Sequence, residues 1–289
     1  MKSLVLGATG QVGFELCRMQ PVRTELVALS RDQLDICDGI AVAAALRRFK
    51  PTVVINAAAY TQVDRAESEP ERAFDVNGMA PGHVASATRA IGARLIHLST
   101  DFIFDGGQPR PWAPGDPGRP LNAYGRSKLA GEGAVQRESH GEAVIVRTAW
   151  LYSTHGTNFV KTMLRLMGAR DVLDVVVDQV GSPTWARSLA RALWMFAIRP
   201  DLRGTYHWTD AGVASWYDFA VAIQEEALSR NLLTRQIAIR AIRSAEYPTA
   251  AQRPPFSVLD TRSTAQDLGL QPEHWRRNLR LMLDEVAAT

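Results

Sequence analysis

Hydrophobic residues gather in five short runs, separated by longer stretches in which apolar positions recur every three or four residues. Short, near-continuous apolar runs are typical of parallel strands that are covered on both faces. Their alternation with helices predicts an α/β fold, a doubly wound parallel sheet of the Rossmann type. The expected strands cover residues 3–6, 25–29, 52–55, 94–98 and 143–146.

Helix start and stop signals lie between these runs. Asp38 predicts the N-cap of a helix that turns residues 44–46 towards the core. A longer helix is expected over residues 71–91, closed by Gly92. Three more helices are expected over residues 188–198, 216–229 and 274–286.

After about residue 150 the predicted strands and helices alternate less regularly, and prolines separate short segments. We therefore expect a dinucleotide-binding Rossmann domain over residues 1–150. Residues 151–289 are expected to form a smaller lobe that mainly binds substrate and is interleaved with the main sheet. The Pro- and Gly-rich stretch 106–120 is expected to be a long functional loop.

Composition narrows the class of protein. Hydrophobic residues make up 46% and charged residues 22% of the chain, and the net charge is +3, so we expect a globular protein without a nucleic-acid partner. Cys17 and Cys37 are too few for a disulfide framework, which favours a reduced, cytoplasmic protein. Gly7 interrupts the first apolar run, and no run reaches the ~20 residues of a membrane helix, so we expect neither a signal peptide nor a membrane partner.

A glycine-rich loop follows the first strand and opens the first helix. Gly7, Gly10 and Gly13 are spaced Gly-x-x-Gly-x-x-Gly, and Gln11 and Val12 begin the helix. Glycines allow a tight turn and close approach to a pyrophosphate, whose charge the helix N-terminus favours. We interpret these five residues as cofactor-binding. The alternative is a purely structural turn.

Two further strand ends bear on the cofactor. Arg31 follows the second strand, where an acidic residue would favour NAD and an arginine can pair with the 2′-phosphate of NADP. A solvated surface arginine is the alternative, so NADPH is favoured and NADH stays open. The small residues Ala57, Ala58 and Ala59 close the third strand, where they either let a dinucleotide approach or pack a strand end.

A proton-transfer pair is predicted at Tyr124 and Lys128, which share one face of a helix at i and i+4. We expect the ammonium to lower the pKa of the phenol, which would then donate a proton to a carbonyl group. Thr100, at the end of the fourth strand, is expected to orient that carbonyl.

Three more residues are candidates for the substrate cleft. Asp101 and Phe102 follow Thr100 directly, and Trp150 follows the fifth strand. The Trp150 ring can stack on a sugar or base of a substrate. The alternative is that it packs in the hydrophobic core. The histidines show no ligand spacing, so no metal site is expected.

Together these motifs resemble the dTDP-4-dehydrorhamnose reductases, within the extended short-chain dehydrogenase/reductase family. The resemblance runs from Met1 to about Pro255. Beyond the glycine loop and the Tyr-Lys pair, it rests on the segments at 56–61, 63–67, 99–106, 124–132, 147–150, 158–159, 178–184 and 253–254.

The resemblance implies NADPH-dependent reduction of the 4-keto group of dTDP-4-dehydro-6-deoxy-L-mannose to dTDP-L-rhamnose, the last step of dTDP-rhamnose biosynthesis. The product of such enzymes serves lipopolysaccharide and O-antigen synthesis. Tyr124 would protonate the 4-oxygen, Lys128 would hold the nicotinamide ribose, and Thr100 would bind the sugar. Further roles implied by the resemblance are contacts to the adenine (Asp35, Ile36), to the middle of the cofactor (Ala57, Ala58, Ala59) and to the sugar nucleotide (Val63, Asp101, Phe102, Trp150).

Two features depart from the family pattern. Phe102 stands where the family commonly has tyrosine. Some members dimerise around Mg²⁺ through a first-helix glutamate and acidic residues after a Pro-Thr turn. Glu15 fits the first part, but Arg187 and Ser188 supply no carboxylate, so we expect a metal-independent monomer or weak homodimer.

Two other functions stay open. The first is a non-catalytic NADP-binding subunit, because the regulatory subunit of methionine adenosyltransferase resembles the same family. The second is another nucleotide-sugar reductase or epimerase. A dehydratase is disfavoured, because it would carry a glutamate at the position of Phe102.

Overall fold

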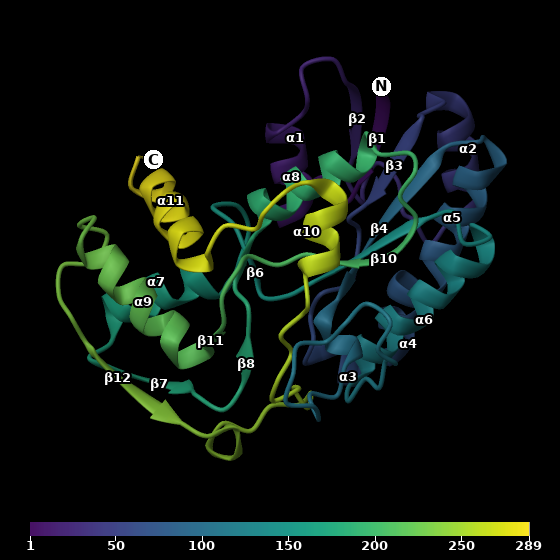
Figure 1. The fold of residues 1–289 in the computed structure, drawn as a ribbon. Helices are drawn as coiled ribbons and strands as arrows, with labels where there is room; N and C mark the ends of the chain where they lie inside the picture. The colour runs from purple at the N-terminus through teal and green to yellow at the C-terminus, as the bar shows by residue number, and fades with distance from the viewer. Residues whose placement is uncertain (289) are drawn as a thin grey trace.

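The computed structural model describes residues 1–288, and a parallel sheet lies at its centre (Figure 1). Within these residues the sheet has six strands in the spatial order β10, β5, β4, β3, β1, β2, and all neighbours are parallel. The strands are β1 (Lys2–Leu6), β2 (Glu25–Leu29), β3 (Val53–Asn56), β4 (Arg94–Thr100), β5 (Val144–Thr148) and β10 (Gly204–His207). The five predicted strands are confirmed, and β10 joins them from the second half of the chain.

The order of the strands reverses beside β1, which lies between β2 and β3. Leu6 pairs with Leu29 of β2 and with Asn56 of β3, so the three strands end at one level. Ligands of open parallel sheets bind at the carboxyl ends of the strands, where such a reversal leaves a crevice. The predicted Rossmann fold is therefore confirmed, with its crevice next to these three residues.

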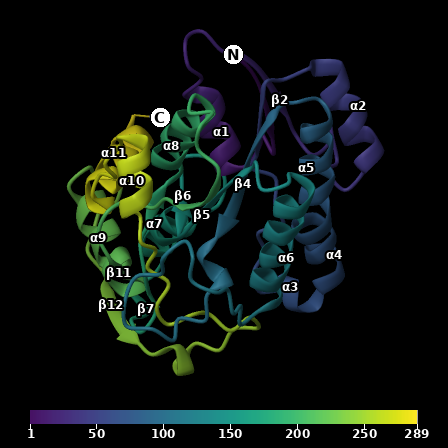
Figure 2. The same cartoon turned by 45° about the vertical axis from the view of Figure 1, so that its right-hand side comes forward.

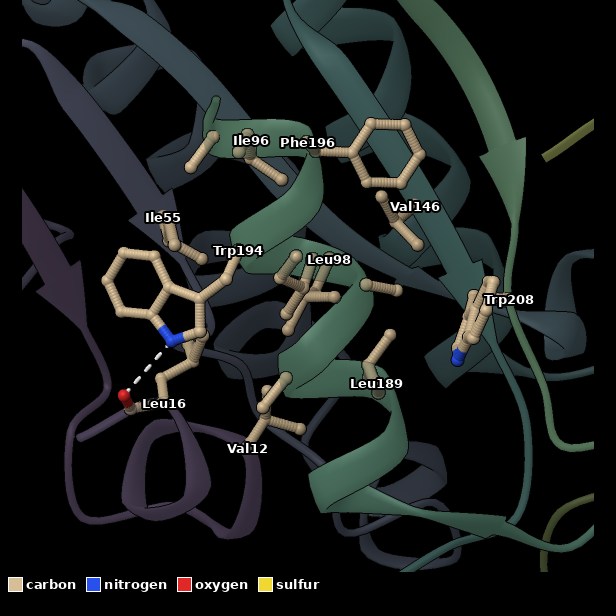
Figure 3. Packing of buried hydrophobic residues seen from close by; sticks show 14 of the residues in the cluster. Val12, Leu16, Ile55, Ile96, Leu98, Val146, Leu189, Trp194, Phe196 and Trp208 are labelled. Carbon is tan, nitrogen blue, oxygen red and sulfur yellow. Dashed lines mark hydrogen bonds between the residues drawn. The ribbon is translucent and has the colours of Figure 1, made fainter. Parts of the chain in front are cut away.

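Helices cover both faces of the sheet. On one face lie α2 (Gly39–Phe49), α5 (Ala80–Ala90) and α6 (Ala123–Glu138), and on the other lie α1 (Gln11–Arg18) and α8 (Ala186–Ala197) (Figure 1). Successive strand residues alternate between the two layers, as a pleated strand requires. The indole N–H of Trp194 on α8 donates a 3.1 Å hydrogen bond to the carbonyl of Leu16, which ties α8 to α1 (Figure 3).

The helix α2 begins as predicted, because the Asp38 side chain accepts a 2.9 Å hydrogen bond from the Ala41 N–H. Of the residues 44–46 predicted to face inward, Leu46 is buried and Ala45 packs partly buried against the core, but the prediction is wrong for Ala44, which is exposed. The two buried residues of this helix are Val42 and Leu46. At 100° per residue, Ala44 lies about 200° from both, on the opposite side of the helix.

The predicted helix over residues 71–91 is not a regular α-helix. It consists of α4 (Pro70–Phe74), a π-helical turn η1 (Asp75–Met79) and then α5. Gly92 follows its end with a left-handed φ of 69°, as a C-terminal glycine was expected to do. The π turn inserts one extra residue, and the buried Asn77 lies within it.

Most elements after residue 150 gather on one side of the sheet (Figure 1), and the turned view in Figure 2 keeps them apart from α2, α5 and α6. There α7 (Phe159–Ala169), α9 (Trp216–Leu228) and α11 (Trp275–Ala287) share one apolar core. The ends of α8, α9 and α11 agree with the predicted helices to within two residues. The accompanying strand pairs are β6 (Leu151–Tyr152) with β9 (Thr184–Trp185), β7 (Val172–Val176) with β12 (Ala238–Ile242), and β8 (Val180–Gly181) with β11 (Ala214–Ser215).

Short α- and 3₁₀-helices complete the described chain. They are α3 (Arg65–Ser68), η2 (Asp101–Ile103), η3 (Ser244–Glu246) and α10 (Arg262–Leu268). Residues 106–120 form the predicted irregular loop, fastened where the Trp112 N–H donates a 2.8 Å hydrogen bond to the Val258 carbonyl. Among residues 1–288, no helix has both the length and the apolar content to cross a bilayer.

Candidate active site

Close backbone approach explains two of the three glycines in the loop after β1. Gly7 has a left-handed φ of 79°, and a Cβ on it would lie 2.7 Å from the Ala58 Cα. A Cβ on Gly13 would lie 2.7 Å from the Ala8 Cα. Larger residues would therefore force the first helix away from the ends of β1 and β3. Gly10 is less constrained and serves as the N-cap of α1.

The N-terminus of α1 is open towards the crevice. Gly10 has no side chain to cap the helix, and the first intrahelical bond is donated by the Phe14 N–H to the Gly10 carbonyl. The earlier N–H groups have no partner within the helix, so they can bind an anion. The Val12 side chain lies in the core beneath α8 (Figure 3), and therefore only its backbone can serve a cofactor. The Gln11 side chain is also engaged, because its Oε1 accepts a 3.0 Å hydrogen bond from Asn158 Nδ2.

A cavity of about 340 Å³ lies beside the glycine loop at the carboxyl ends of β1, β2 and β3. Its walls bring together most of the predicted cofactor residues. They are Gly7, Gly10, Arg31, Asp35, Ile36, Ala57, Ala58 and Ala59. Two further cations on the same wall were not predicted from the sequence. They are Arg65, the variable position of the 63–67 motif, and Arg72, which follows that motif.

Arg31 lies on the rim of this cavity with a mostly exposed side chain. Its guanidinium is 3.9 Å from the Asp35 carboxylate. An ion pair of this length between exposed groups is weak. The guanidinium is therefore free to turn towards a phosphate group, as its predicted role requires.

A buried amide fixes the end of β3. The Ala58 N–H donates to Asn56 Oδ1 at 3.2 Å, and Asn56 Nδ2 hydrogen-bonds His97 Nδ1 at 3.2 Å. Because an amide nitrogen can only donate, His97 Nδ1 accepts and its proton lies on Nε2. Burial, and then the charge of Lys128, hold the pKa of His97 well below its usual value, so the ring is neutral.

The structure brings Thr100, Tyr124 and Lys128 together at the carboxyl end of β4. Tyr124 lies in the first turn of α6, buried, with its phenol at Thr100. Lys128 lies one turn further and donates a 2.7 Å hydrogen bond to the Leu98 carbonyl. The Asn122 side chain caps this helix by accepting from the Gly125 N–H at 2.8 Å.

The predicted lowering of the Tyr124 pKa is wrong for this structure. Burial raises the pKa of Tyr124 to about 12, the hydrogen bond with Thr100 lowers it, and the charge of Asp101 raises it further. Burial also lowers the pKa of Lys128 to about 8, against the attraction of Glu132. The i,i+4 spacing predicted that Tyr124 and Lys128 share a helix face, but it did not indicate how strongly burial raises the pKa of the phenol. A protonated phenol at neutral pH remains compatible with a proton donor.

Asp101 and Phe102 differ in their surroundings. The Asp101 carboxylate is buried and accepts a 3.0 Å hydrogen bond from Thr100 Oγ1, and burial raises its pKa to about 6. The Phe102 ring meets the Tyr124 ring edge to face, at 5.7 Å and 75°. Val63, like Phe102, packs against a small apolar cluster that contains Tyr124. The hydrogen bond with Asp101 thus fixes the Thr100 side chain, and Val63 and Phe102 pack around Tyr124.

Trp150 connects the main sheet to the second group of elements. Its backbone has a left-handed φ of 46°, and its ring stacks on Trp216 at 3.5 Å and 2°. A Cβ on Gly181 would lie 2.5 Å from this ring, so glycine is needed there. One face of Trp150 is therefore covered by protein, and its predicted sugar contact would use the other face or an edge.

A second cavity, of about 600 Å³, lies among the elements after residue 150. Apolar side chains from α7 and β7 and the Trp216 ring form its wall. Arg253, Gln179 and Asp64 add polar groups, and Arg253 Nη2 pairs with Asp64 Oδ2 at 2.6 Å. No sequence pattern predicted this cavity, because its lining comes from positions between 64 and 253.

Glu15, the carboxylate considered for Mg²⁺, is paired with arginine. Arg187 Nε lies 3.2 Å from Glu15 Oε2, and its Nη2 donates a 2.8 Å hydrogen bond to Glu285 Oε2. Arg18 Nη1 is 3.2 Å from the same Glu285 oxygen. Residues 1–288 contain no group of three or more His, Cys, Asp or Glu side chains arranged to hold a metal. These residues do not fit a divalent cation, because a guanidinium already lies between the carboxylates.

Comparison with known proteins extends the match along the whole described chain. The family model described as "RmlD substrate binding domain" matches residues 1–288. The chain belongs to this family. A relative from the RmlD family, the dTDP-4-dehydrorhamnose reductase of Burkholderia thailandensis, is 42% identical over 99% of both chains.

Two solved structures of the RmlD family have the same fold. The dTDP-4-dehydrorhamnose reductase of Clostridium acetobutylicum superimposes with a TM-score of 0.92 and 36% identity, over 99% of both chains. That of Bacillus anthracis, solved in complex with NADP, gives a TM-score of 0.91 and 34% identity, over 98% of this chain and 99% of that one. The family resemblance inferred from the motifs is therefore confirmed.

Proposed function

We propose that this chain is an NADPH-dependent reductase that converts the 4-keto group of dTDP-4-dehydro-6-deoxy-L-mannose into the hydroxyl of dTDP-L-rhamnose. The observation that carries the proposal is the convergence of Thr100, Tyr124 and Lys128 at the same sheet edge as the glycine-lined cavity. The names of the RmlD relatives support the reaction and the substrate.

The cofactor proposal rests on the first cavity. The open N-terminus of α1 suits a diphosphate, and Arg31 suits the 2′-phosphate that distinguishes NADPH from NADH. The Bacillus anthracis relative, which was solved with NADP, supports the same choice. When bound, the nicotinamide supplies a hydride to the carbonyl carbon.

Tyr124 supplies the proton. As C4 of the sugar gains the hydride, its oxygen gains negative charge, and the buried phenol can transfer its proton to that oxygen. Thr100, whose single hydroxyl proton is donated to Asp101 Oδ1 in this structure, turns that proton to the same oxygen when the ketone binds and so orients it. One hydride and one proton together convert the ketone into an alcohol.

Lys128 acts on the phenolate that remains after this transfer. Its ammonium lies one helical turn from Tyr124 and is buried, so its charge is little screened. The 2.7 Å hydrogen bond to Leu98 fixes its position while leaving further N–H donors for a ribose hydroxyl. We propose that it holds the nicotinamide ribose and stabilises the phenolate.

The substrate would extend from this centre towards the second cavity. Its keto sugar would lie against Val63, Phe102 and Trp150, and its nucleotide would reach towards Arg253. In this proposal the chain after residue 150 mainly forms the substrate-binding lobe. We further propose a cytoplasmic monomer or weak homodimer, in keeping with the unpaired Cys17 and Cys37.

The test is to mix purified protein with NADPH and the keto-sugar nucleotide, and to follow NADPH absorbance and the sugar product. A reductase consumes NADPH in a one-to-one ratio with dTDP-L-rhamnose formed. A non-catalytic NADP-binding subunit would bind NADPH without consuming it, and an epimerase would change the sugar with no net consumption. Either of these two results would refute the proposal.

A further inference from the structure

A segment of the second half of the chain, residues 153–158, lies against the glycine loop. It connects β6 to α7, and none of its residues lines the cofactor cavity or the catalytic centre. His155 Nε2 lies 2.9 Å from the Thr9 carbonyl oxygen, and Asn158 Nδ2 donates to Gln11 Oε1 at 3.0 Å. These contacts link positions 146 and 147 residues apart in the sequence.

The contact with Thr9 determines which group is the donor. A carbonyl oxygen can only accept a hydrogen bond, so His155 Nε2 carries the proton and donates. The N–H of the same peptide group, that of Gly10, donates to the Gly7 carbonyl at 3.1 Å. Both polar groups of the Thr9–Gly10 peptide are therefore engaged, and its orientation is fixed.

This orientation bears on anion binding. A carbonyl oxygen that turned towards a bound diphosphate would repel it, whereas the N–H groups at the start of α1 attract it. His155 holds the Thr9 carbonyl towards the second half of the chain. The loop is thereby kept in the form that presents N–H groups to an anion.

The segment itself is firmly held. The His155 ring stacks on Phe14 of α1, at 4.3 Å and 10°, and the backbone N–H of His155 donates to Ser153 Oγ at 3.1 Å. Ser153 Oγ donates in turn to Glu15 Oε1 at 3.1 Å. Asn158 closes the segment through a 2.6 Å hydrogen bond to the Ser153 carbonyl and caps α7 by accepting from the Lys161 N–H. The imidazole therefore reaches Thr9 from a rigid support.

We infer that His155 is a positioning residue for the dinucleotide: its Nε2–H holds the Thr9 peptide so that the glycine loop is preorganised for the diphosphate. This inference rests on the proposed NADPH-dependent function. It assigns His155 to cofactor affinity and not to the transfer of the hydride or the proton. Loss of the donor should raise the dissociation constant of NADPH and leave turnover at saturating NADPH unchanged.

Two substitutions separate the donor from the ring. His155→Phe keeps a ring that can stack on Phe14 but removes the N–H, and His155→Gln keeps an N–H donor. We expect His155→Phe to raise the dissociation constant of NADPH about 3- to 10-fold, which is the change in affinity that the loss of one hydrogen bond usually causes. His155→Gln should stay within about twofold of the wild type. The KM for the keto-sugar nucleotide should not change in either variant.

A smaller ligand shows whether the effect concerns the diphosphate. Adenosine 2′-monophosphate carries the adenine end of NADPH but no diphosphate, so its affinity should be equal in the wild type and in His155→Phe. If NADPH binds to His155→Phe as tightly as to the wild type, the inference is wrong. It is also wrong if both ligands weaken alike, or if Gln and Phe act alike, because the effect is then a general structural one. A wild-type protein that bound no NADPH would contradict the proposed function as well.

Discussion

The ammonium of Lys128 donates a 2.7 Å hydrogen bond to the carbonyl oxygen of Leu98, in the interior of the protein. A buried ammonium lowers the free energy of unfolding, because its charge has lost its hydration and one hydrogen bond replaces only part of it. Burial accordingly lowers the pKa of Lys128 to about 8. The residue that should stabilise a phenolate is therefore one that destabilises the folded chain at neutral pH.

This cost has a definite pH dependence. Between about pH 8 and 10.5 the unfolded chain binds a proton at Lys128 that the folded chain does not, so the free energy of unfolding should rise with pH across this window. The rise should amount to roughly 3 kcal/mol. Lys128→Met should remove it, so that the difference in stability between variant and wild type shrinks as the pH rises. Urea denaturation at a series of pH values measures this.

Lys161→Met is a matched control for the Lys128 experiment. Lys161 also donates to a carbonyl, that of Thr154 at 3.2 Å, but it is exposed. Its replacement should leave the shape of the stability curve unchanged. Parallel curves for the wild type and Lys128→Met would show that the buried charge is not costly.

Arg31→Ala should separate the two nicotinamide cofactors. A charge-assisted contact to a phosphate is worth more than a neutral one, so NADPH should bind at least ~10-fold more weakly. NADH lacks the 2′-phosphate, and its affinity should change by less than about twofold. Titration of both cofactors checks this, with Arg47→Ala on the exposed side of α2 as the control. Equal losses for NADPH and NADH would mean that Arg31 does not read the 2′-phosphate.

Arg187→Ala should destabilise the fold. The Glu15 carboxylate is fully buried, and without Arg187 its nearest cation is Arg18, at 3.7 Å. Removal of one partner from a buried ion pair leaves the other charge only partly compensated, and we expect a loss of about 2–4 kcal/mol in the free energy of unfolding. Glu15→Gln together with Arg187→Ala should recover much of this loss. A double variant as unstable as Arg187→Ala would assign the effect to packing.

The same arrangement predicts the response to metal removal. Because Arg187 already supplies the positive charge between Glu15 and Glu285, EDTA should not change the melting temperature or the activity. Melting curves with EDTA and with added Mg²⁺ measure this directly. A melting temperature that falls with EDTA and recovers with Mg²⁺ would contradict it.

Local sequence patterns were sufficient for the framework of the site. The apolar runs located five strands, and the glycine spacing located the loop, because both features depend on neighbours along the chain. The strand β10 was missed because its four residues, Gly204–His207, include a glycine and no aliphatic apolar side chain. The π turn η1 was also missed, since helical periodicity does not reveal one inserted residue.

Features that depend on tertiary packing could not be predicted from local sequence patterns. The direction of the Tyr124 pKa shift follows from how completely the phenol is buried, which the Tyr-x-x-x-Lys spacing does not report. The role of Asn77 is similar: its side chain bonds both the N–H and the carbonyl of Tyr60 and also donates to Ser127 Oγ at 3.1 Å. Those partners lie 17 and 50 residues away, so no local motif marks them.

The most direct test of the account is a single-turnover measurement of NADPH oxidation by Tyr124→Phe with the keto-sugar nucleotide. The substitution removes the hydroxyl and keeps the ring that packs against Phe102. We predict that the rate falls at least ~10²-fold, while the dissociation constant of NADPH stays close to that of the wild type. A variant that oxidised NADPH at the wild-type rate would show that Tyr124 is not the proton donor.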